Sequence, residues 1–508
     1  MEKESRSFLD KVAFIETKLD EVLKSAFKTE KKYKGRLKDI EPEYSASAIN
    51  LLDYLAFRSF DIDKLQKKMQ KLGFSDLSDI SSHVRQTLIS VKGIADMVLG
   101  KKPKYEDEEY ITARKSQKLL EANCDALFGP KPEKRGTRIM VTMPSQAATD
   151  ITIIESMLDA GMNCARINCA HDTPEIWDTI IENIQTAAKS MGKECSIVMD
   201  IAGPKIRTGV LAGDPIVIKE GDTLVLTREL TPGEGRTDNA PAHIGCTLEN
   251  VFQCAKPGNR IYYDDGKVEG NIEKVSPDKI EVRITNAKSS GSKIKEDKGL
   301  NFPDTRLNCH GFTEKDKEHL ALIAQNQEKW KIQAINLSFV NSPSELDMMI
   351  HYIKKLGLRT GIIIKIETEQ AFEHLPGIIL SAMKIYPAGI MLARGDLAIE
   401  TGWKNFATIQ EEIIRITAAA HLPLVWATQV LETLAKDGVP TRAEITDAAL
   451  SERSSCVMLN KGRYIVMAIR MLDKIVRRME KFRTKSENVL PKLDGVEKLM
   501  LSHRKYDI

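Results

Sequence analysis

The chain has 508 residues, 42% of them apolar, which is enough hydrophobic sequence for about three folded domains at roughly 150 residues each. Lys and Arg number 75 against 72 Asp and Glu, so the net charge is only +3. That balance excludes a protein held to nucleic acid or to an anionic membrane by an overall basic surface. The charged start and the lack of an apolar run of about eighteen residues predict a cytoplasmic protein with no membrane span.

Eight cysteines are spread along the chain without a C-x-x-C pair. This spacing supports neither a zinc ribbon nor a disulfide framework, and several of the cysteines stand in apolar runs. We therefore expect buried, reduced thiols in a reducing compartment. They are Cys124, Cys164, Cys169, Cys195, Cys246, Cys254, Cys309 and Cys456.

The first 130 residues carry apolar side chains three and four positions apart, as in residues 8–13 and 51–55. This spacing predicts amphipathic helices, each with one buried face. A charged stretch at 101–109 and a Gly- and Pro-rich run at 129–136 end the region. We expect an N-terminal helical domain at residues 1–130 that either covers the rest of the protein or mediates self-association.

From Thr137 onward, short apolar runs alternate with segments of helical period, such as 344–356 and 406–420. This is the pattern of parallel β/α units. Eight strands with about as many helices predict an α/β protein with a closed TIM barrel, whose active site lies at the C-terminal ends of its strands. The barrel is expected at residues 131–208 and 300–485. Its predicted strands are 137–143, 164–169, 195–201, 334–340, 360–366, 389–393, 424–427 and 456–460.

Residues 209–299 interrupt this rhythm, because they lack helical period and show turn signals and alternating β-type runs. The segment follows the third predicted barrel strand, so it is expected to be an inserted small β-barrel domain that overhangs the strand ends as a lid. Its candidate strands are 216–218, 223–226, 260–263 and 279–284. Residues 486–508 are predicted to form a short C-terminal tail.

The clearest chemical signal is the pair Lys365 and Glu367, which alternation places on one face at the end of a strand. Such a pair is either a structural salt bridge at the barrel mouth or part of a site. The next predicted strand ends with Asp396. Two carboxylates on adjacent strand ends suit Mg²⁺, which keeps waters and leaves room for substrate oxygens.

Other polar residues end neighbouring strands. Arg166 and Asn168 share a face at the end of the second strand, where Arg166 is either a packing residue or a fork of donors for a phosphate. Asp200 ends the third strand, ahead of a turn with two more cations. Thr428 presents a hydroxyl at the end of the seventh.

These stretches together resemble the pyruvate kinase family over most of residues 137–480. The family's layout, a barrel with a β domain inserted after its third strand, agrees with the pattern described above. The matching segments are 161–168 (GMNCARIN), 203–209 (GPKIRTG), 264–266 (DDG), 298–303 (KGLNFP), 338–340 (SFV), 365–367 (KIE), 393–397 (ARGDL), 427–432 (ATQVLE) and 440–444 (PTRAE).

The resemblance implies an enzyme of glycolysis that moves the phosphoryl group of phosphoenolpyruvate to ADP, giving pyruvate and ATP. By this likeness Glu367 and Asp396 bind Mg²⁺, with Mn²⁺ as the alternative ion. The catalytic residues are Lys365, Arg166 and Thr428, and Thr428 lies where the family organises protonation of the enolate. The phosphoenolpyruvate-binding residues are Arg166, Lys365, Gly395, Asp396 and Thr428, and the nucleotide-binding residues are Asn168, His171, Arg207 and Lys298.

The chain departs from the family at the site where many members hold K⁺. Asn168 and Asp200 remain there, but Ala170 and Ile201 stand at the Ser and Thr positions. Lys205 stands where K⁺-dependent relatives have Glu, and family members with Lys there resemble those that work without K⁺. An ammonium can supply the same unit charge, so the sequence predicts a K⁺-independent enzyme.

Two further departures leave alternatives open. After Asn460 the chain lacks the family's Ser-Gly-Glu-Thr-Ala run, and the family's C-terminal regulatory domain is replaced by the N-terminal helices. One alternative is therefore a non-catalytic protein that binds phosphoenolpyruvate or nucleotide as a sensor or scaffold. Another is a Mg²⁺-enolate lyase on a similar barrel, which the inserted domain argues against. The sequence is compatible with a homo-oligomer.

Overall fold

The computed structural model describes residues 2–74, 77–105, 107–306 and 311–482. The predicted C-terminal tail and Cys309 lie outside these residues. Among those described, no helix combines the length and the apolar composition needed to cross a lipid bilayer. The seven described cysteines form no disulfide, and all of them are buried except the half-buried Cys195 and Cys254.

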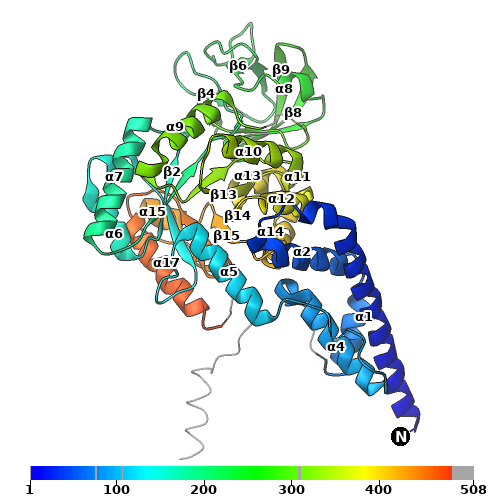
Figure 1. Cartoon of the computed structure of the whole chain (residues 1–508). Coiled ribbons are helices and arrows are strands. Elements are labelled where there is room, and N and C mark those ends of the chain that lie inside the picture. The colour runs from blue at the N-terminus through cyan, green and yellow to red at the C-terminus, as the bar shows by residue number, and fades with distance from the viewer. Residues whose placement is uncertain (1, 75–76, 106, 307–310, 483–508) are drawn as a thin grey trace, which may run out of the picture.

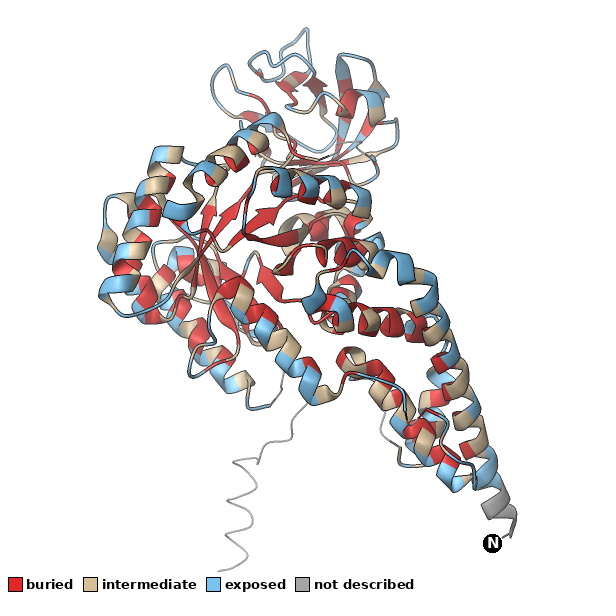
Figure 2. Ribbon diagram, in the orientation of Figure 1, coloured by how far each residue is buried: buried red, intermediate tan, exposed pale blue. Residues whose placement is uncertain are grey.

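Eight parallel strands make up the centre of the molecule. They are β1 (Arg138–Thr142), β2 (Cys164–Asn168), β3 (Ser196–Asp200), β12 (Ala334–Leu337), β13 (Gly361–Ile366), β14 (Ala388–Ala393), β15 (Leu424–Ala427) and β16 (Cys456–Leu459). They close into a barrel in the order β1-β16-β15-β14-β13-β12-β3-β2 (Figure 1). The strands are almost wholly buried (Figure 2), as expected for apolar runs that are covered on both faces. The predicted TIM barrel is confirmed, and β14 alone begins outside its predicted segment, by one residue.

Helices cover the outside of this barrel. After the first three strands they are α6 (Ile151–Ala160), α7 (Pro174–Ser190) and α9 (Glu314–Trp330). After β12, β13 and β14 they are α10 (Pro343–Lys355), α11 (Glu369–Glu373), α12 (Leu375–Ala382), α13 (Arg394–Thr401) and α14 (Trp403–Ala419). The chain then forms α15 (Glu432–Asp437), α16 (Arg442–Leu450) and α17 (Ile465–Met479).

The inserted segment carries two sheets above the barrel (Figure 1). Its elements are β4 (Ile216–Ile218), β5 (Thr223–Thr227), β6 (Ala242–Gly245), α8 (Val251–Cys254), β7 (Arg260–Tyr263), β8 (Val268–Val275), β9 (Lys279–Asn286), β10 (Ser292–Ile294) and β11 (Leu300–Asn301). The six-stranded sheet has the order β11-β7-β8-β9-β5-β6, and β10 pairs with β4 apart from it. The predicted β domain is thus present where the sequence places it, after the third barrel strand, with its strands paired in two sheets.

The N-terminal region is helical, as the sequence predicts. Its helices are α1 (Glu2–Leu37), α2 (Ser45–Arg58), α3 (Asp63–Lys71), α4 (Val84–Val98) and α5 (Ala113–Phe128). Helices α1 and α4 form an arm that projects from the barrel on the side away from the lid (Figure 1).

Helix α5 closes the bottom of the barrel. Leu127 and Phe128 at its end belong to the cluster of side chains that fills the barrel interior. A Cβ atom at Gly361 would lie 2.8 Å from Leu127 Cδ1, and one at Gly389 would lie 2.6 Å from Leu127 Cδ2. Both strands therefore need glycine at this position, because Leu127 occupies the space where a side chain would stand.

Polar contacts fix the N-terminal helices to the barrel. The backbone N–H of Ala388 donates to Tyr44 Oη at 2.7 Å, and Asn50 donates to the Ala419 carbonyl at 2.8 Å. His421 is 1% exposed, and its Nε2 lies 2.8 Å from the Ser82 carbonyl while its Nδ1 lies 3.0 Å from Ser47 Oγ. Since a carbonyl only accepts, the neutral ring carries its proton on Nε2. Burial lowers the pKa of His421 to about 4.

Replacing Leu127 with Ala is expected to destabilise the protein by about 3 kcal/mol, because the change removes buried methyl groups and leaves a cavity that the rigid barrel cannot fill. Urea unfolding followed by circular dichroism measures the loss. Lys118→Ala, at an exposed position of the same helix, is the control and should change stability by less than about 0.5 kcal/mol. Equal effects of the two changes would contradict the role of Leu127 as a plug.

Acid should weaken the junction at His421. The unfolded chain binds a proton at this ring near pH 6.5 and the folded chain only near pH 4, so the contribution is complete above pH 6.5 and falls as the pH drops. Between about pH 7.5 and about pH 5, the wild type should lose about 2 kcal/mol more unfolding free energy than the non-titrating His421→Gln variant. Parallel pH profiles of the two proteins would refute this assignment.

Candidate active site at the barrel mouth

The carboxylate of Asp200, at the end of β3, lies at the centre of the barrel mouth and is 2% exposed. Arg166 Nε donates to its Oδ2 at 2.6 Å, and Lys365 Nζ lies 3.5 Å from its Oδ1. Burial by itself raises the pKa of Asp200, but Arg166 and Lys365 outweigh it and lower the pKa to about 2. Asp200 is therefore ionised and joins the two cations.

Lys365 and Glu367 lie side by side, as strand alternation predicts. Lys365 Nζ is 3.0 Å from Glu367 Oε1 and donates to Ser338 Oγ at 2.8 Å. Glu367 is 3% exposed, and its other oxygen accepts from the Phe339 backbone N–H at 2.8 Å. Burial opposes the charge of Lys365, but Asp200 and Glu367 raise its pKa. The ammonium is thus charged and held by three fixed partners.

Asp396 lies in the first turn of α13, one strand further around the barrel. Lys205, from the loop after β3, lies 3.0 and 3.1 Å from its two oxygens. Burial raises the pKa of Asp396, whereas Lys205 and then Lys365 lower it, with a net lowering. Lys365 forms an ion pair with Glu367, and its charge also lowers the pKa of Asp396. One ammonium group therefore stabilises the charged form of both carboxylates.

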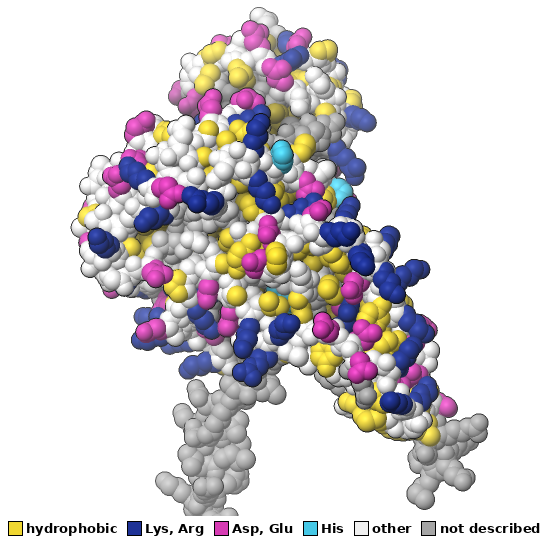
Figure 3. Space-filling view, viewed as in Figure 1, with side chains coloured by type: hydrophobic (Ala, Val, Ile, Leu, Met, Phe, Trp, Pro, Cys, Tyr) yellow, Lys and Arg dark blue, Asp and Glu magenta, His cyan; other side chains and the backbone are white. Residues whose placement is uncertain are grey.

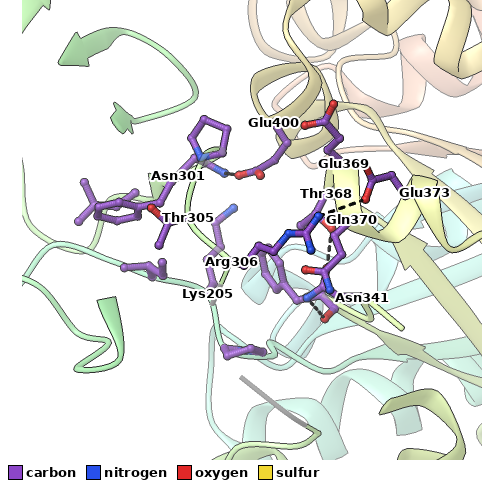
Figure 4. A pocket seen from close by; sticks show the side chains of 16 residues that line it. Lys205, Asn301, Thr305, Arg306, Asn341, Thr368, Glu369, Gln370, Glu373 and Glu400 are labelled. Atoms are coloured by element: carbon purple, nitrogen blue, oxygen red, sulfur yellow. Dashed lines mark hydrogen bonds and ion pairs between the residues drawn. The ribbon is translucent and has the colours of Figure 1, made fainter. Parts of the chain in front are cut away.

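Strand β11, where the chain leaves the lid, brings Asn301 next to Asp396. Asn301 Nδ2 lies 3.4 Å from Asp396 Oδ1 and donates to Glu400 Oε1 at 3.2 Å. These groups border a cavity of about 140 Å³, in which Asn301 and Glu400 face each other while Arg306 faces Glu373 (Figure 4). Burial, together with Asp396, raises the pKa of Glu400 to about 7, although Asn301 opposes the shift.

Thr428 follows β15 with its backbone in the left-handed region, at a φ of 68°. This is costly for a β-branched residue, so the surrounding structure must enforce it. Arg394 does so by donating to the Thr428 and Ala427 carbonyls. The Thr428 hydroxyl is buried without a hydrogen-bond partner among the described residues and stands beside Gly395. Its predicted contact with phosphoenolpyruvate stays a prediction.

The residues predicted to meet a nucleotide lie on the lid side of β2. His171 is exposed; partial burial, with the charges of Lys461 and Arg207, lowers its pKa. Arg207 donates to the Asp297 carbonyl at 2.9 Å. Lys298 Nζ lies 3.9 Å from Asp264, so it faces the lid turn. Asn168, in contrast, caps its own turn by accepting from the Ala170 N–H at 3.1 Å.

Of the three residues assigned to the monovalent-cation region, Asn168 and Asp200 are register partners on β2 and β3, and Lys205 comes from the loop that follows β3. Asp200 binds Arg166 and Lys365, Asn168 caps a local turn, and Lys205 binds Asp396. The ammonium of Lys205 therefore stands among the acidic groups of the mouth and contacts Asp396 there. Its use in place of K⁺ stays a prediction.

Two polar residues at the mouth were not assigned a role from the sequence. Asn336 is fully buried in β12, where its Nδ2 donates to Asp200 Oδ2 at 3.0 Å and its Oδ1 lacks a partner among the described residues. Ser338 accepts from Lys365 and donates to the Ile201 carbonyl at 2.7 Å. Asn336 and Ser338 are two positions apart in an apolar run, as Lys365 and Glu367 are. The same strand alternation could therefore have identified them as residues that face the barrel mouth.

The acidic groups fit a hard divalent cation. Glu367 and Asp396 supply carboxylate oxygens, the ligands that Mg²⁺ prefers. The described residues hold no group of three or more acidic, His or Cys side chains suited to bind one ion. The binding of Mg²⁺ by these two carboxylates stays a prediction.

The chain matches the family description "Pyruvate kinase, barrel domain" over residues 134–463. It is 30% identical over 353 residues to a pyruvate kinase of Thermococcus litoralis, covering 68% of this chain and 70% of that protein. It is 31% identical to a pyruvate kinase of Thermotoga maritima, with 68% and 72% covered, and 26% identical to one of Mycobacterium tuberculosis, with 68% and 70% covered. The fold places the chain among the TIM-barrel proteins, with acidic and basic side chains gathered at the barrel mouth. The family match shows that it belongs to the pyruvate kinase family.

Proposed function

We propose that the protein transfers the phosphoryl group of phosphoenolpyruvate to ADP, giving pyruvate and ATP, as a cytoplasmic glycolytic enzyme dependent on Mg²⁺ or Mn²⁺. One observation carries this proposal: Lys365 and Arg166 bind the same buried carboxylate of Asp200 and so stand as a fixed pair of cations. A transferring phosphoryl group needs such positive charge around its oxygens.

The reaction breaks the bond between phosphorus and the enol oxygen and forms one to a terminal phosphate oxygen of ADP. The divalent ion, when bound by Glu367 and Asp396, supplies positive charge to the phosphoryl and enolate oxygens. Among the described contacts Arg166 uses Nε and Nη1, which leaves Nη2 for a phosphate oxygen. Lys365 cannot swing away, since Ser338 and two carboxylates hold it. It therefore meets the developing charge without reorganisation.

The residues proposed to position the substrate and to organise proton transfer lie at the start of α13 and just after β15. The backbone N–H groups of Gly395 and Asp396 belong to the first turn of α13, where helical N–H groups lack intrahelical partners and favour an anionic carboxylate. After transfer, the enolate takes a proton at its methylene carbon. The unpartnered Thr428 hydroxyl beside Gly395 is suited to organise that step. His171, Arg207 and Lys298 are assigned to the nucleotide phosphates, with Asn168 shaping the turn beside them.

A second candidate is a protein that binds phosphoenolpyruvate or nucleotide without turnover. The short connection between β16 and α17 favours it, because only residues 460–464 stand where the family has a longer run. The buried charges of Arg166 and Glu367, with the half-buried Lys365 between them, oppose it, since unpaired burial of such groups is costly. Measured turnover separates the two.

In a coupled assay of pyruvate formation from phosphoenolpyruvate and ADP, Lys365→Met is expected to lower kcat by at least about 100-fold, because it removes one fixed cation from the phosphoryl group. Lys293→Met, at an exposed lid position, is the matched control and should leave kcat unchanged. Thermal melts exclude unfolding as the cause. A wild type no faster than Lys365→Met would end the enzymatic proposal, while calorimetric binding of phosphoenolpyruvate would then support the sensor.

The proposal includes independence from K⁺, because Lys205 places a cation beside Asp396. Wild-type turnover in KCl and in tetramethylammonium chloride is expected to agree within about twofold. Lys205→Glu should lower turnover in both salts, since it sets a third carboxylate against Asp396 and Asp265, whose pKa burial and Asp396 already raise. Severalfold activation of the wild type by K⁺ would contradict this part alone.

A further inference from the structure

The lid stands above the barrel as a separate lobe (Figure 3) and joins it through two short stretches of chain. We call residues 203–208 the outgoing hinge segment and residues 297–301 the returning hinge segment. The two pair with each other, because the Thr208 N–H donates to the Lys298 carbonyl and the Leu300 N–H to the Ile206 carbonyl, both at 2.9 Å. A movement of the lid relative to the barrel therefore has to shift this pair.

Each hinge segment places one polar side chain on the carboxylate of Asp396 in the barrel. Lys205 of the outgoing segment lies 3.0 and 3.1 Å from its two oxygens. Asn301 of the returning segment lies 3.4 Å from Oδ1 and also donates to Glu400 at 3.2 Å (Figure 4). The Lys205 ammonium has no hydrogen-bond partner other than Asp396 in the described part of the chain, whereas Asn301 has a second one.

The surroundings of Asp396 are acidic. Burial together with the charge of Asp396 raises the pKa of Asp265 in the lid and of Glu400 in α13, so the three carboxyl groups lie near one another. Lys205 sets one unit of positive charge against them, and a divalent cation would supply two. The electrostatic attraction of this place for a divalent cation therefore exceeds its attraction for the ammonium.

Of the two ammonium groups at the barrel mouth, Lys205 is the one that is free to move. Asp200, Glu367 and Ser338 all hold Lys365, whose side chain is 13% exposed. The Lys205 side chain is 27% exposed and has Asp396 alone. Its stem runs past Gly299 of the returning segment, where a Cβ atom would lie 3.2 Å from Lys205 Cε, so the glycine leaves room for the stem.

We propose that Lys205 holds the outgoing hinge segment on Asp396 in the metal-free protein, and that a divalent cation bound by Asp396 exchanges with this ammonium and releases the segment. The inference rests on the proposed role of Asp396 in metal binding. Asn301 keeps its bond to Glu400 during the exchange, so the returning segment stays anchored to the barrel. One carboxylate then links ion binding to the freedom of the lid.

Mn²⁺ binding to the full chain, measured by electron paramagnetic resonance without substrate, tests the exchange. Lys205→Met is expected to lower the Kd for Mn²⁺ at least about tenfold, because the ion then displaces no ammonium. Lys205→Arg keeps the positive charge, so its Kd should stay within about twofold of the wild type or rise above it. Lys293→Met, at an exposed lid position, is the matched control and should bind Mn²⁺ as the wild type does.

Hydrogen exchange read by mass spectrometry tests the release of the hinge. In the wild type, saturating Mg²⁺ should speed exchange of the amides of residues 203–208 severalfold, since the segment loses its side-chain anchor. In Lys205→Met these amides should exchange fast without Mg²⁺ and change little when it is added. Because the first comparison uses the wild type alone, it decides the question even where a variant folds poorly.

The proposal is overturned by Mn²⁺ binding in Lys205→Met that is no tighter than in the wild type, or by a lack of Mn²⁺ binding in both. Hinge exchange that Mg²⁺ leaves unchanged or slows in the wild type would overturn it as well. None of these measurements requires turnover. A chain that shows the exchange but forms no pyruvate would support this inference and refute the proposed activity, while an active chain with an unaffected hinge would do the reverse.

Discussion

The buried carboxylate of Asp200 holds the barrel mouth together. A lone charge at such depth would be strongly unfavourable, and it persists because Arg166, Lys365 and the Asn336 amide surround it. The same contacts fix the two cations before any substrate arrives. Removing one partner would leave the others buried and uncompensated, so the cluster acts as a unit. Both carboxylate oxygens of Asp200 therefore meet protein donors, with Arg166 and Asn336 on one and Lys365 on the other.

The rest of the fold supports that cluster from below. The barrel needs a filled interior to keep its strand ends at fixed positions, and Leu127 of α5 supplies the lowest layer. Gly361 and Gly389 make room for it on β13 and β14, the strands that end at Lys365 and at the α13 turn of Asp396. An N-terminal helix thus packs against the strands that place Lys365 and Asp396. This explains why the added helices are joined to the barrel by buried contacts.

Much of this arrangement follows from sequence pattern alone. Alternation in 362–367 was enough to place Lys365 and Glu367 together, because a strand has a fixed period of two. Strand alternation cannot predict contacts between residues that are far apart in the sequence. Lys205 contacts Asp396 although 191 positions separate them, and Asn301 contacts Asp396 from the lid. The left-handed backbone at Thr428 is another such case, since nothing local to a threonine indicates it. In α4 the periodic apolar residues Val84, Leu88 and Val91 are buried as the pattern predicts, but the pattern does not indicate that Arg85, Lys92 and Asp96 are buried beside them as ion pairs.

The N-terminal arm projects away from the barrel mouth, but other N-terminal elements contact the barrel close to it. The arm of α1 and α4 projects from the barrel on the side away from the lid, while Asp200, Lys365 and Asp396 lie at the strand ends beneath the lid (Figure 1). Helix α2 and the 3-10 turn at Ser81–His83 pack on α14, which directly follows α13, and α13 carries Asp396 and Glu400. The N-terminal helices therefore contact the barrel through a helix that continues from the turn holding Asp396, so their packing bears on the position of this carboxylate.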